Sequence, residues 1–205
     1  FTFSKNTIDT YKIENELLRK CVKNSHINKY HIDYQEIYLL YSDNNFEQEK
    51  YPNAYEYLKK HKTELLNRRG PLHNEYDWHR LHRPSIKEIF DAKEKLVVPY
   101  RADYNKFAYD DEQYFNDGGD IRAIVIKDGE KINIKYILGI LNSKLMNWLY
   151  GFIGKPKGGM REYFNEPMAK IPIKSIDFNN PTEKQLHDKL VSLVDGMLET
   201  QKLFH

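Results

Sequence analysis

The feature that most constrains the fold is a nearly continuous apolar segment at residues 135–153, followed directly by a stretch rich in glycine and lysine. A helix drawn through this segment is apolar on almost every face, and such helices are buried in a core. We therefore expect a deeply buried helix. Residues 154–162 are then expected to form a loop that this helix holds on a rigid platform. No run in the sequence reaches the roughly 20 apolar residues that a membrane-spanning helix needs.

Hydrophobic periodicity elsewhere predicts helices and strands in an irregular order. Pro52 suits a first helical turn, Gly70 and Pro71 stop a helix, and Ser85 suits an N-cap. The expected helices cover residues 7–23, 51–69, 85–91 and 182–203, and the expected strands cover 36–41, 95–100, 106–109, 113–115, 121–127 and 169–173. This order favours an α+β fold with small mixed or antiparallel twisted sheets, packed helices and a long C-terminal helix.

The composition and charge are typical of an ordinary soluble globular protein. The net charge is only +2, so its distribution is more informative than its sum. Acidic residues gather at 110–112 and 117–120, and basic residues gather at 68–69, 80–83 and 155–161. This layout fits a protein that grips nucleic acid on one face, and it fits plain solvation equally well. The single cysteine, Cys21, is expected to be a small buried hydrophobe in a reducing cytoplasm.

One candidate polyanion-binding segment is the glycine- and lysine-rich stretch. Glycine lets a backbone approach a ligand closely, and the cations of Lys155, Lys157 and Arg161 can contact phosphate or bases. Lys157 and Arg161 are the strongest of these candidates. The alternative is a solvated loop with no ligand.

A second candidate is residues 78–84, which alternate aromatic or apolar residues with basic ones. Arginine can pair bidentately with phosphate or guanine. The candidates for DNA contact here are Trp78, His79, Arg80 and Arg83. A core position is favoured for the tryptophan, and pairing with carboxylates of the same domain is favoured for the arginines.

A third, weaker candidate group for DNA contact follows the strand expected at 95–100. It consists of Arg101, Asn105 and Lys106 on a connection between strands.

Catalytic patterns are missing from the sequence. The glycine pairs lack the strand–turn–helix setting of a phosphate-binding loop, and no serine lies in a nucleophile elbow. His73, Asp77, His79 and His82 are close in sequence, but neighbouring arginines repel a cation. We therefore predict no catalytic and no metal-binding residue. The rival hypothesis is a metal-dependent nuclease built on the aspartate-rich turns and the histidines of 73–82.

Several segments, in their order, resemble the TaqI-like C-terminal specificity domain of adenine-specific DNA methyltransferases and type IIG restriction enzymes. They are residues 17–30, 51–58, 78–84, 95–99, 136–145 with the following glycine–lysine stretch, and 170–173. Residues 136–145 match most strongly. A departure is Asn24-Ser25-His26, which replaces the usual Gly-Arg-Asp.

The resemblance implies a sequence-specific duplex-DNA recognition module over residues 1–173, with a linker and a packing or spacer helix over 174–205. It further implies a cytoplasmic parent in which a methyltransferase domain, in cis or in trans, binds S-adenosylmethionine and methylates adenine N6 after base flipping. A fused nuclease would add Mg²⁺. Neither the glycine-rich cofactor loop nor the catalytic Pro-Pro motif of that domain occurs here, so we expect no enzyme activity and no cofactor in this segment.

The C-terminal helix expected over 182–203 leaves two more hypotheses open. One is a module like those of type I specificity subunits, in which a similar helix follows the recognition domain. The second is a protein-interaction module that pairs through the same helix, because an apolar stripe also suits any docked helix.

Overall fold

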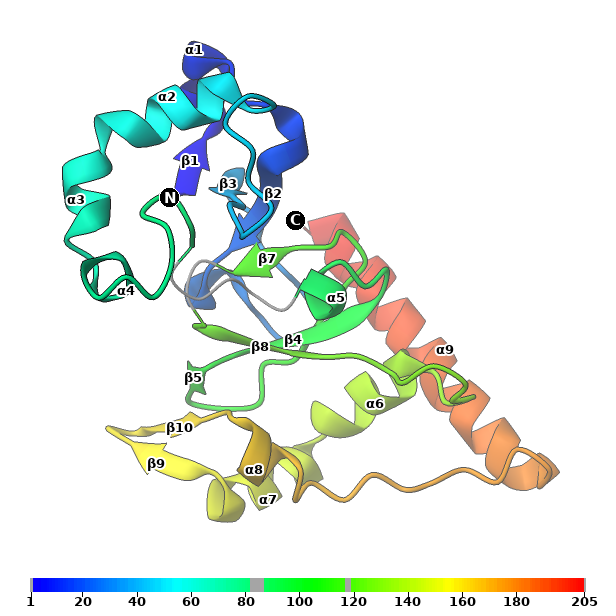
Figure 1. Ribbon diagram of the computed structural model, residues 1–205. Coiled ribbons are helices and arrows are strands. Elements are labelled where there is room, and N and C mark those ends of the chain that lie inside the picture. Colours follow the sequence, from blue (N-terminus) through cyan, green and yellow to red (C-terminus); the bar gives the residue numbers. More distant parts are fainter. Residues whose placement is uncertain (1, 82–86, 117–118, 205) are drawn as a thin grey trace.

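The structure is a computed structural model that describes residues 2–81, 87–116 and 119–204. Helices and strands are mixed along the chain, as the α+β prediction required (Figure 1). The α-helices are α1 (Lys5–Tyr11), α2 (Pro52–Lys60), α3 (Lys62–Leu66), α4 (Arg69–Leu72), α5 (Lys87–Phe90), α6 (Ile134–Leu141), α7 (Lys144–Ile153), α8 (Asn165–Met168) and α9 (Pro181–Phe204). Two 3₁₀ turns, η1 (Asn15–Leu17) and η2 (Asn24–His26), flank the second strand.

Within the described ranges, the strands form three small sheets with orders β1-β3-β2-β7, β6-β4-β8 and β5-β10-β9. All their pairings are antiparallel except that of β2 with β7. The strands are β1 (Thr2–Ser4), β2 (Leu18–Val22), β3 (Ile37–Leu40), β4 (Lys95–Pro99), β5 (Arg101–Ala102), β6 (Ala108–Asp110), β7 (Phe115–Asn116), β8 (Ile121–Ile124), β9 (Lys155–Lys157) and β10 (Met160–Glu162).

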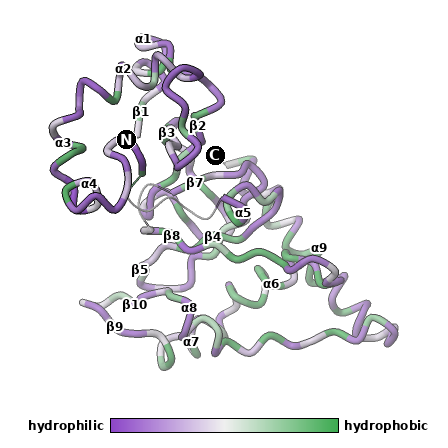
Figure 2. The backbone as a smooth tube through the Cα atoms, viewed as in Figure 1, coloured by the Kyte–Doolittle hydropathy of each residue, from purple (hydrophilic) through white to green (hydrophobic). Residues whose placement is uncertain are grey.

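The largest hydrophobic cluster lies where α6, α7 and α9 pack against the sheet of β4. Leu96 and Val98 from β4 meet Leu138 from α6 and Val194 from α9. Gly139 permits the close approach of the two helices, because a Cβ there would lie 2.9 Å from Leu190 and 3.0 Å from Val194. In Figure 2, α6 is largely hydrophobic while the strands of β9 and β10 are mostly hydrophilic. The predicted long C-terminal helix is confirmed, and it packs on the core.

The helix expected over 7–23 is wrong beyond Tyr11. Lys12 takes the left-handed conformation, with φ 53°, and its N–H bonds to Ile8 O. The chain then forms β2, which pairs with both β3 and β7. Cys21 is fully buried in this strand, so the expected small buried hydrophobe is confirmed although its helical register is not.

Two other predicted helices are divided. The helix of 51–69 begins at Pro52 as expected, where Glu14 accepts from the N–H groups of Asn53 and Ala54, and breaks at His61. The helix of 135–153 breaks at Asn142, whose amide exchanges two hydrogen bonds with the backbone of Phe107, at 3.1 and 2.8 Å. Ser143 then caps α7 through Met146 N–H.

The expectation of deep burial holds for α6 and is wrong for the outer face of α7. Leu145, Trp148 and Phe152 are 62%, 61% and 71% exposed. The strand expected at 169–173 is also wrong: α8 precedes it, and Ile171 enters the core from irregular backbone. The N-cap predicted at Ser85 lies outside the described residues. The helix α5 begins at Lys87, two residues later.

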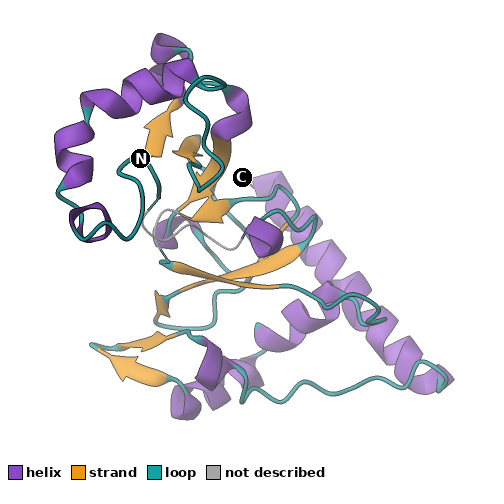
Figure 3. Cartoon of the chain, in the orientation of Figure 1, coloured by secondary structure: helices purple, strands orange, loops and turns teal. Residues whose placement is uncertain are grey.

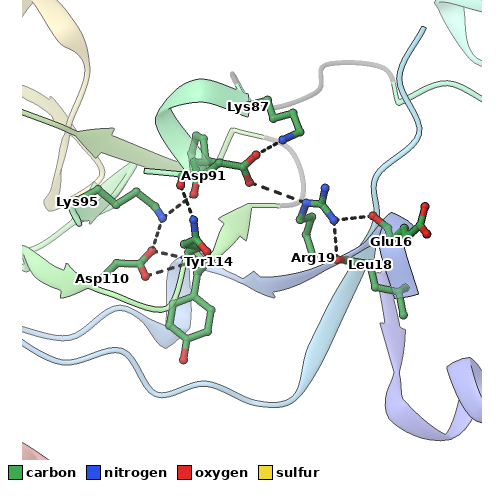
Figure 4. Close-up of polar contacts among 10 residues, drawn as sticks. Glu16, Leu18, Arg19, Lys87, Asp91, Lys95, Asp110 and Tyr114 are labelled. Atoms are coloured by element: carbon green, nitrogen blue, oxygen red, sulfur yellow. Dashed lines mark hydrogen bonds and ion pairs between the residues drawn. The ribbon is translucent and has the colours of Figure 1, made fainter. Parts of the chain in front are cut away.

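A polar network joins the sheet of β1, β3, β2 and β7 to the sheet of β6, β4 and β8 (Figure 4). Lys95 on β4 and Asp110 on β6 form an ion pair at 2.7 Å with no exposed side-chain surface. Asp110 also accepts from the backbone N–H groups of Glu112 and Tyr114. Asp91, which follows α5, pairs with Arg19 on β2 and with Lys87. These contacts fix α5 between the two sheets.

No helix in the described part of the chain is long and apolar enough to span a membrane.

Candidate nucleic-acid interface

The glycine- and lysine-rich stretch forms a β-hairpin rather than a loop (Figure 3). Gly158 and Gly159 connect β9 to β10 with φ of 56° and 81°, as a two-residue type I′ turn requires. β9 is an edge strand, where the missing N–H of Pro156 costs no ladder bond. β10 pairs in turn with β5, so the hairpin is the outer part of a three-stranded sheet.

Strand register decides which side chains share a face of this sheet. Glu162 lies opposite both Lys155 and Arg101, and Met160 lies opposite Lys157. Residues directly opposite on antiparallel strands point to the same side, and so do residues two apart on one strand. Arg101, Lys155, Lys157, Met160 and Glu162 therefore line one face, which we call the cationic sheet face.

The cationic sheet face carries three cations and one carboxylate. Glu162 Oε1 accepts from Arg101 Nε and NH2 at 3.0 and 2.9 Å, and Lys155 Nζ lies 3.6 Å from Oε2. The hydrogen bond from Arg101 and the charges of Arg101 and both lysines lower the pKa of Glu162, although burial opposes them. Lys157 is exposed and has no ion pair with a described residue. The face therefore keeps a net positive charge that attracts polyanions.

Arg161 points to the opposite side and anchors the hairpin. Its NH1 donates to the backbone O and the Oδ1 of Asn147 on α7, at 2.8 and 3.1 Å. Gly151, also on α7, lies beside the guanidinium, and a Cβ there would be in ordinary contact with it at 3.7 Å. The residue that the sequence favoured as a DNA contact is thus engaged in holding the sheet on α7.

The third predicted group is divided among three places. Arg101 lies on the cationic sheet face. Asn105 is only 1% exposed; its Nδ2 donates to Leu141 O at 2.7 Å and its Oδ1 accepts from Tyr163 Oη at 2.9 Å. Lys106 contacts Asp103 at 3.2 Å and lies over the Tyr104 ring. Asn105 therefore supports the interior, and the other two residues reach solvent.

The Trp78–Arg80 segment packs against the N-terminal part of the molecule. Trp78 contacts the Tyr55 ring and the Lys62 ammonium, and joins the cluster around Leu58. Arg68 fixes the backbone by donating to Trp78 O and Arg80 O at 2.6 and 2.8 Å.

The side chains of His79 and Arg80 contact their own surroundings. His79 lies beside the Phe46 ring and 3.4 Å from Ser42 Oγ, and burial lowers its pKa. Arg80 lies over Tyr76. Arg83 is outside the described residues.

Sequence reasoning missed Arg122 and Tyr100. Arg122 on β8 lies over the Tyr100 ring, 5.0 Å from its centroid, and Arg101 lies 5.4 Å from the same ring. The only signal in the sequence was one arginine inside an otherwise apolar strand segment.

Carboxylates concentrate elsewhere. A groove of about 350 Å³ between β6 and the C-terminal half of α9 is lined by Asp111, Glu112, Asp195 and Glu199, beside two lysines. This groove is formed by other elements than the cationic sheet face.

Among the described residues, no three histidine, cysteine or carboxylate side chains gather as a metal ion would need. His82 and Asp117, which belonged to the rival nuclease hypothesis, lie outside the described residues.

Comparison with known proteins assigns the chain to a family. A family model, the TaqI-like C-terminal specificity domain, matches residues 19–173. The chain belongs to this family. The match covers every strand from β4 to β10 and all three members of the cationic sheet face that carry positive charge.

Relatives come from bacteria and an archaeon. The chain is 28% identical over 153 residues to the type II restriction enzyme and methyltransferase RM.Eco57I of Escherichia coli, covering 70% of the chain and 15% of that protein. It is 29% identical over 161 residues to the type II methyltransferase M.HindII of Haemophilus influenzae, covering 74% and 30%. With M.MjaIV of Methanocaldococcus jannaschii the identity is 29% over 195 residues, covering 89% and 63%. The chain therefore spans less than two thirds of each.

Proposed function

We propose that this chain is the DNA target-recognition module of a restriction–modification methyltransferase, and that the cationic sheet face contacts duplex DNA. Membership of the specificity-domain family supports the first part. The observation that carries the second is the placement of Arg101, Lys155 and Lys157 on one side of a sheet whose single facing carboxylate is already shared.

The roles of the predicted site residues follow from their surroundings. Lys155, Lys157 and Arg101 contact phosphates or base edges, and Lys106 lies at the flank. Arg161 and Asn105 position this surface through Asn147 instead of contacting DNA. Trp78, His79 and Arg80 pack within the N-terminal part of the chain, and we propose a supporting role for that segment.

A rigid hairpin suits sequence reading. A two-stranded ribbon fits the major groove of B-form DNA, and its contact atoms must be held in place for direct readout. The type I′ turn, the pairing of β10 with β5 and the Arg161–Asn147 contact together restrain the hairpin.

The catalytic part of the parent belongs to the same proposal. The named relatives are methyltransferases, one of which is also a restriction enzyme, and the chain covers only 15% and 30% of the first two. We propose a cytoplasmic parent whose separate domain, in cis or in trans, uses S-adenosylmethionine to methylate adenine N6. A fused nuclease, if present, would supply the Mg²⁺ chemistry.

The test is selection from a library of randomised duplexes, followed by anisotropy titration of the enriched sequence and of random duplex at several salt concentrations. We expect one enriched sequence, and affinity for both duplexes that falls steeply with salt. Absence of binding at low salt would contradict the proposal, and binding without any enriched sequence would reduce it to non-specific DNA binding.

A further inference from the structure

Tyr100 lies at the junction of two sheets. Its N–H donates to Asp120 O at 2.6 Å, which extends the pairing of β4 with β8. Its carbonyl accepts from Tyr163 N–H at 2.8 Å, which joins it to the end of β10. The Tyr100 backbone is therefore fixed on both sides, between the sheet of β8 and the sheet of β10.

Two guanidinium groups contact the Tyr100 ring, and they differ in their other partners. Arg101 lies 5.4 Å from the ring centroid and is held by Glu162. Arg122 lies 5.0 Å from the centroid, and no carboxylate of a described residue forms an ion pair with it. Packing on an aromatic face restrains a guanidinium and leaves its N–H edge available for bidentate pairing with an oxyanion.

Gly119 lies beside the guanidinium of Arg122. Gly119 has φ +91°, and a Cβ built there would meet within 4 Å only the Arg122 NH1 atom, at 3.9 Å. The Arg122 side chain is part-exposed. A phosphate group can thus approach the guanidinium beside a residue without a side chain.

We propose that Arg122, held on the ring of Tyr100, is a DNA-phosphate contact that extends the cationic sheet face from the hairpin onto β8. This inference rests on the proposed function and names an additional contact residue for it. Tyr100 is a positioning residue, because it acts through the guanidinium.

The experiment measures how the duplex dissociation constant depends on salt for wild-type chain, Arg122→Gln and Arg122→Lys. The matched control is Lys189→Gln, which removes one exposed cation from α9. Each lost phosphate contact makes the plot of log association constant against log salt less steep by about 0.9. We expect that decrease for Arg122→Gln on the enriched and on random duplexes alike, and a wild-type slope for Arg122→Lys and Lys189→Gln.

A wild-type slope for Arg122→Gln overturns this inference and leaves the proposed function standing. A loss of affinity confined to one DNA sequence has the same consequence. A reduced slope for Arg122→Lys also overturns it, because charge would then not be the property that matters. Circular dichroism of each variant separates unfolding from lost contact. Failure of the wild-type chain to bind any duplex overturns the proposed function itself, and with it this inference.

Discussion

Arg161 and Asn147 form the contact that holds the hairpin on α7: one guanidinium nitrogen donates to both the backbone oxygen and the side-chain oxygen of the asparagine, at 2.8 and 3.1 Å. The same Asn147 Oδ1 accepts from Asn105 N–H at 2.9 Å. Asn147 therefore joins both β10 and the segment that follows β5 to α7. The cationic sheet face lies on the other side of this junction.

Replacing Arg161 by alanine should lower the free energy of unfolding. Hydrogen bonds that involve a charged group contribute about 1.5–3 kcal/mol, so we expect a loss of about 1–3 kcal/mol in urea denaturation. Lys157→Ala is the matched control, because that lysine is exposed and should change stability by less than about 0.5 kcal/mol. An Arg161→Ala chain of wild-type stability that has lost DNA binding would restore the direct-contact role that the sequence suggested.

The contact between Glu162 and Arg101 should make the stability of the fold depend on pH in the acid range. The folded-state pKa of Glu162 is depressed below its ordinary 4.5, chiefly by the Arg101 hydrogen bond. A depressed pKa contributes stability that is present above the unfolded value and is lost as pH falls through the folded value. Melting temperatures measured from about pH 3 to about pH 6 should therefore fall less steeply on the acid side in Glu162→Gln than in wild type.

The control for this pH profile is Glu166→Gln, which removes an exposed carboxylate paired with Lys170. Its acid limb should follow that of the wild type, because exposed pairs contribute little. Identical acid limbs for wild type and Glu162→Gln would show that the Glu162 contact does not stabilise the fold.

Replacing Lys95 by methionine should be the most destabilising of the single changes considered. It leaves Asp110 buried without its cation, and breaking such a pair costs about 3–5 kcal/mol. Lys20→Met removes a cation from a pair with Glu112 in which both side chains are substantially exposed, and should cost at most about 1 kcal/mol. Chemical denaturation of both variants checks this, and equal effects would mean that burial of the Lys95 pair is not decisive.

Elements with strong local signals could be predicted from the sequence. Pro52 marks the start of α2, and the apolar stripe of α9 extends over many turns. The segment around Cys21 could not be assigned, because a short apolar run fits both a buried strand and a helix. Its conformation is decided by pairing with β3 and with Phe115, far away in the sequence. Asn142 divides the apolar segment for a similar reason, since its partner Phe107 is 35 residues away in the sequence.

The sequence pointed to the segment on which the proposed site lies, but not to the orientation of its side chains. Lysines beside glycines drew attention to the segment that the structure shows as the β9–β10 hairpin. The Gly158-Gly159 pair between two short runs was also a hairpin signal. Recognising it would have placed Lys155 and Lys157 on one face and Arg161 on the other. The burial of Asn105 and the packing of Arg122 on Tyr100 depend on sheet contacts that no local pattern encodes.

The central claim is that the cationic sheet face is the surface that contacts duplex DNA, and lysine acetylation with mass-spectrometric readout tests it most directly. Both Lys155 and Lys157 are exposed in the free chain, as is Lys189 on α9. We predict that saturating duplex slows modification of Lys155 and Lys157 and leaves Lys189 unchanged. Equal modification of the two hairpin lysines with and without bound DNA would contradict the account.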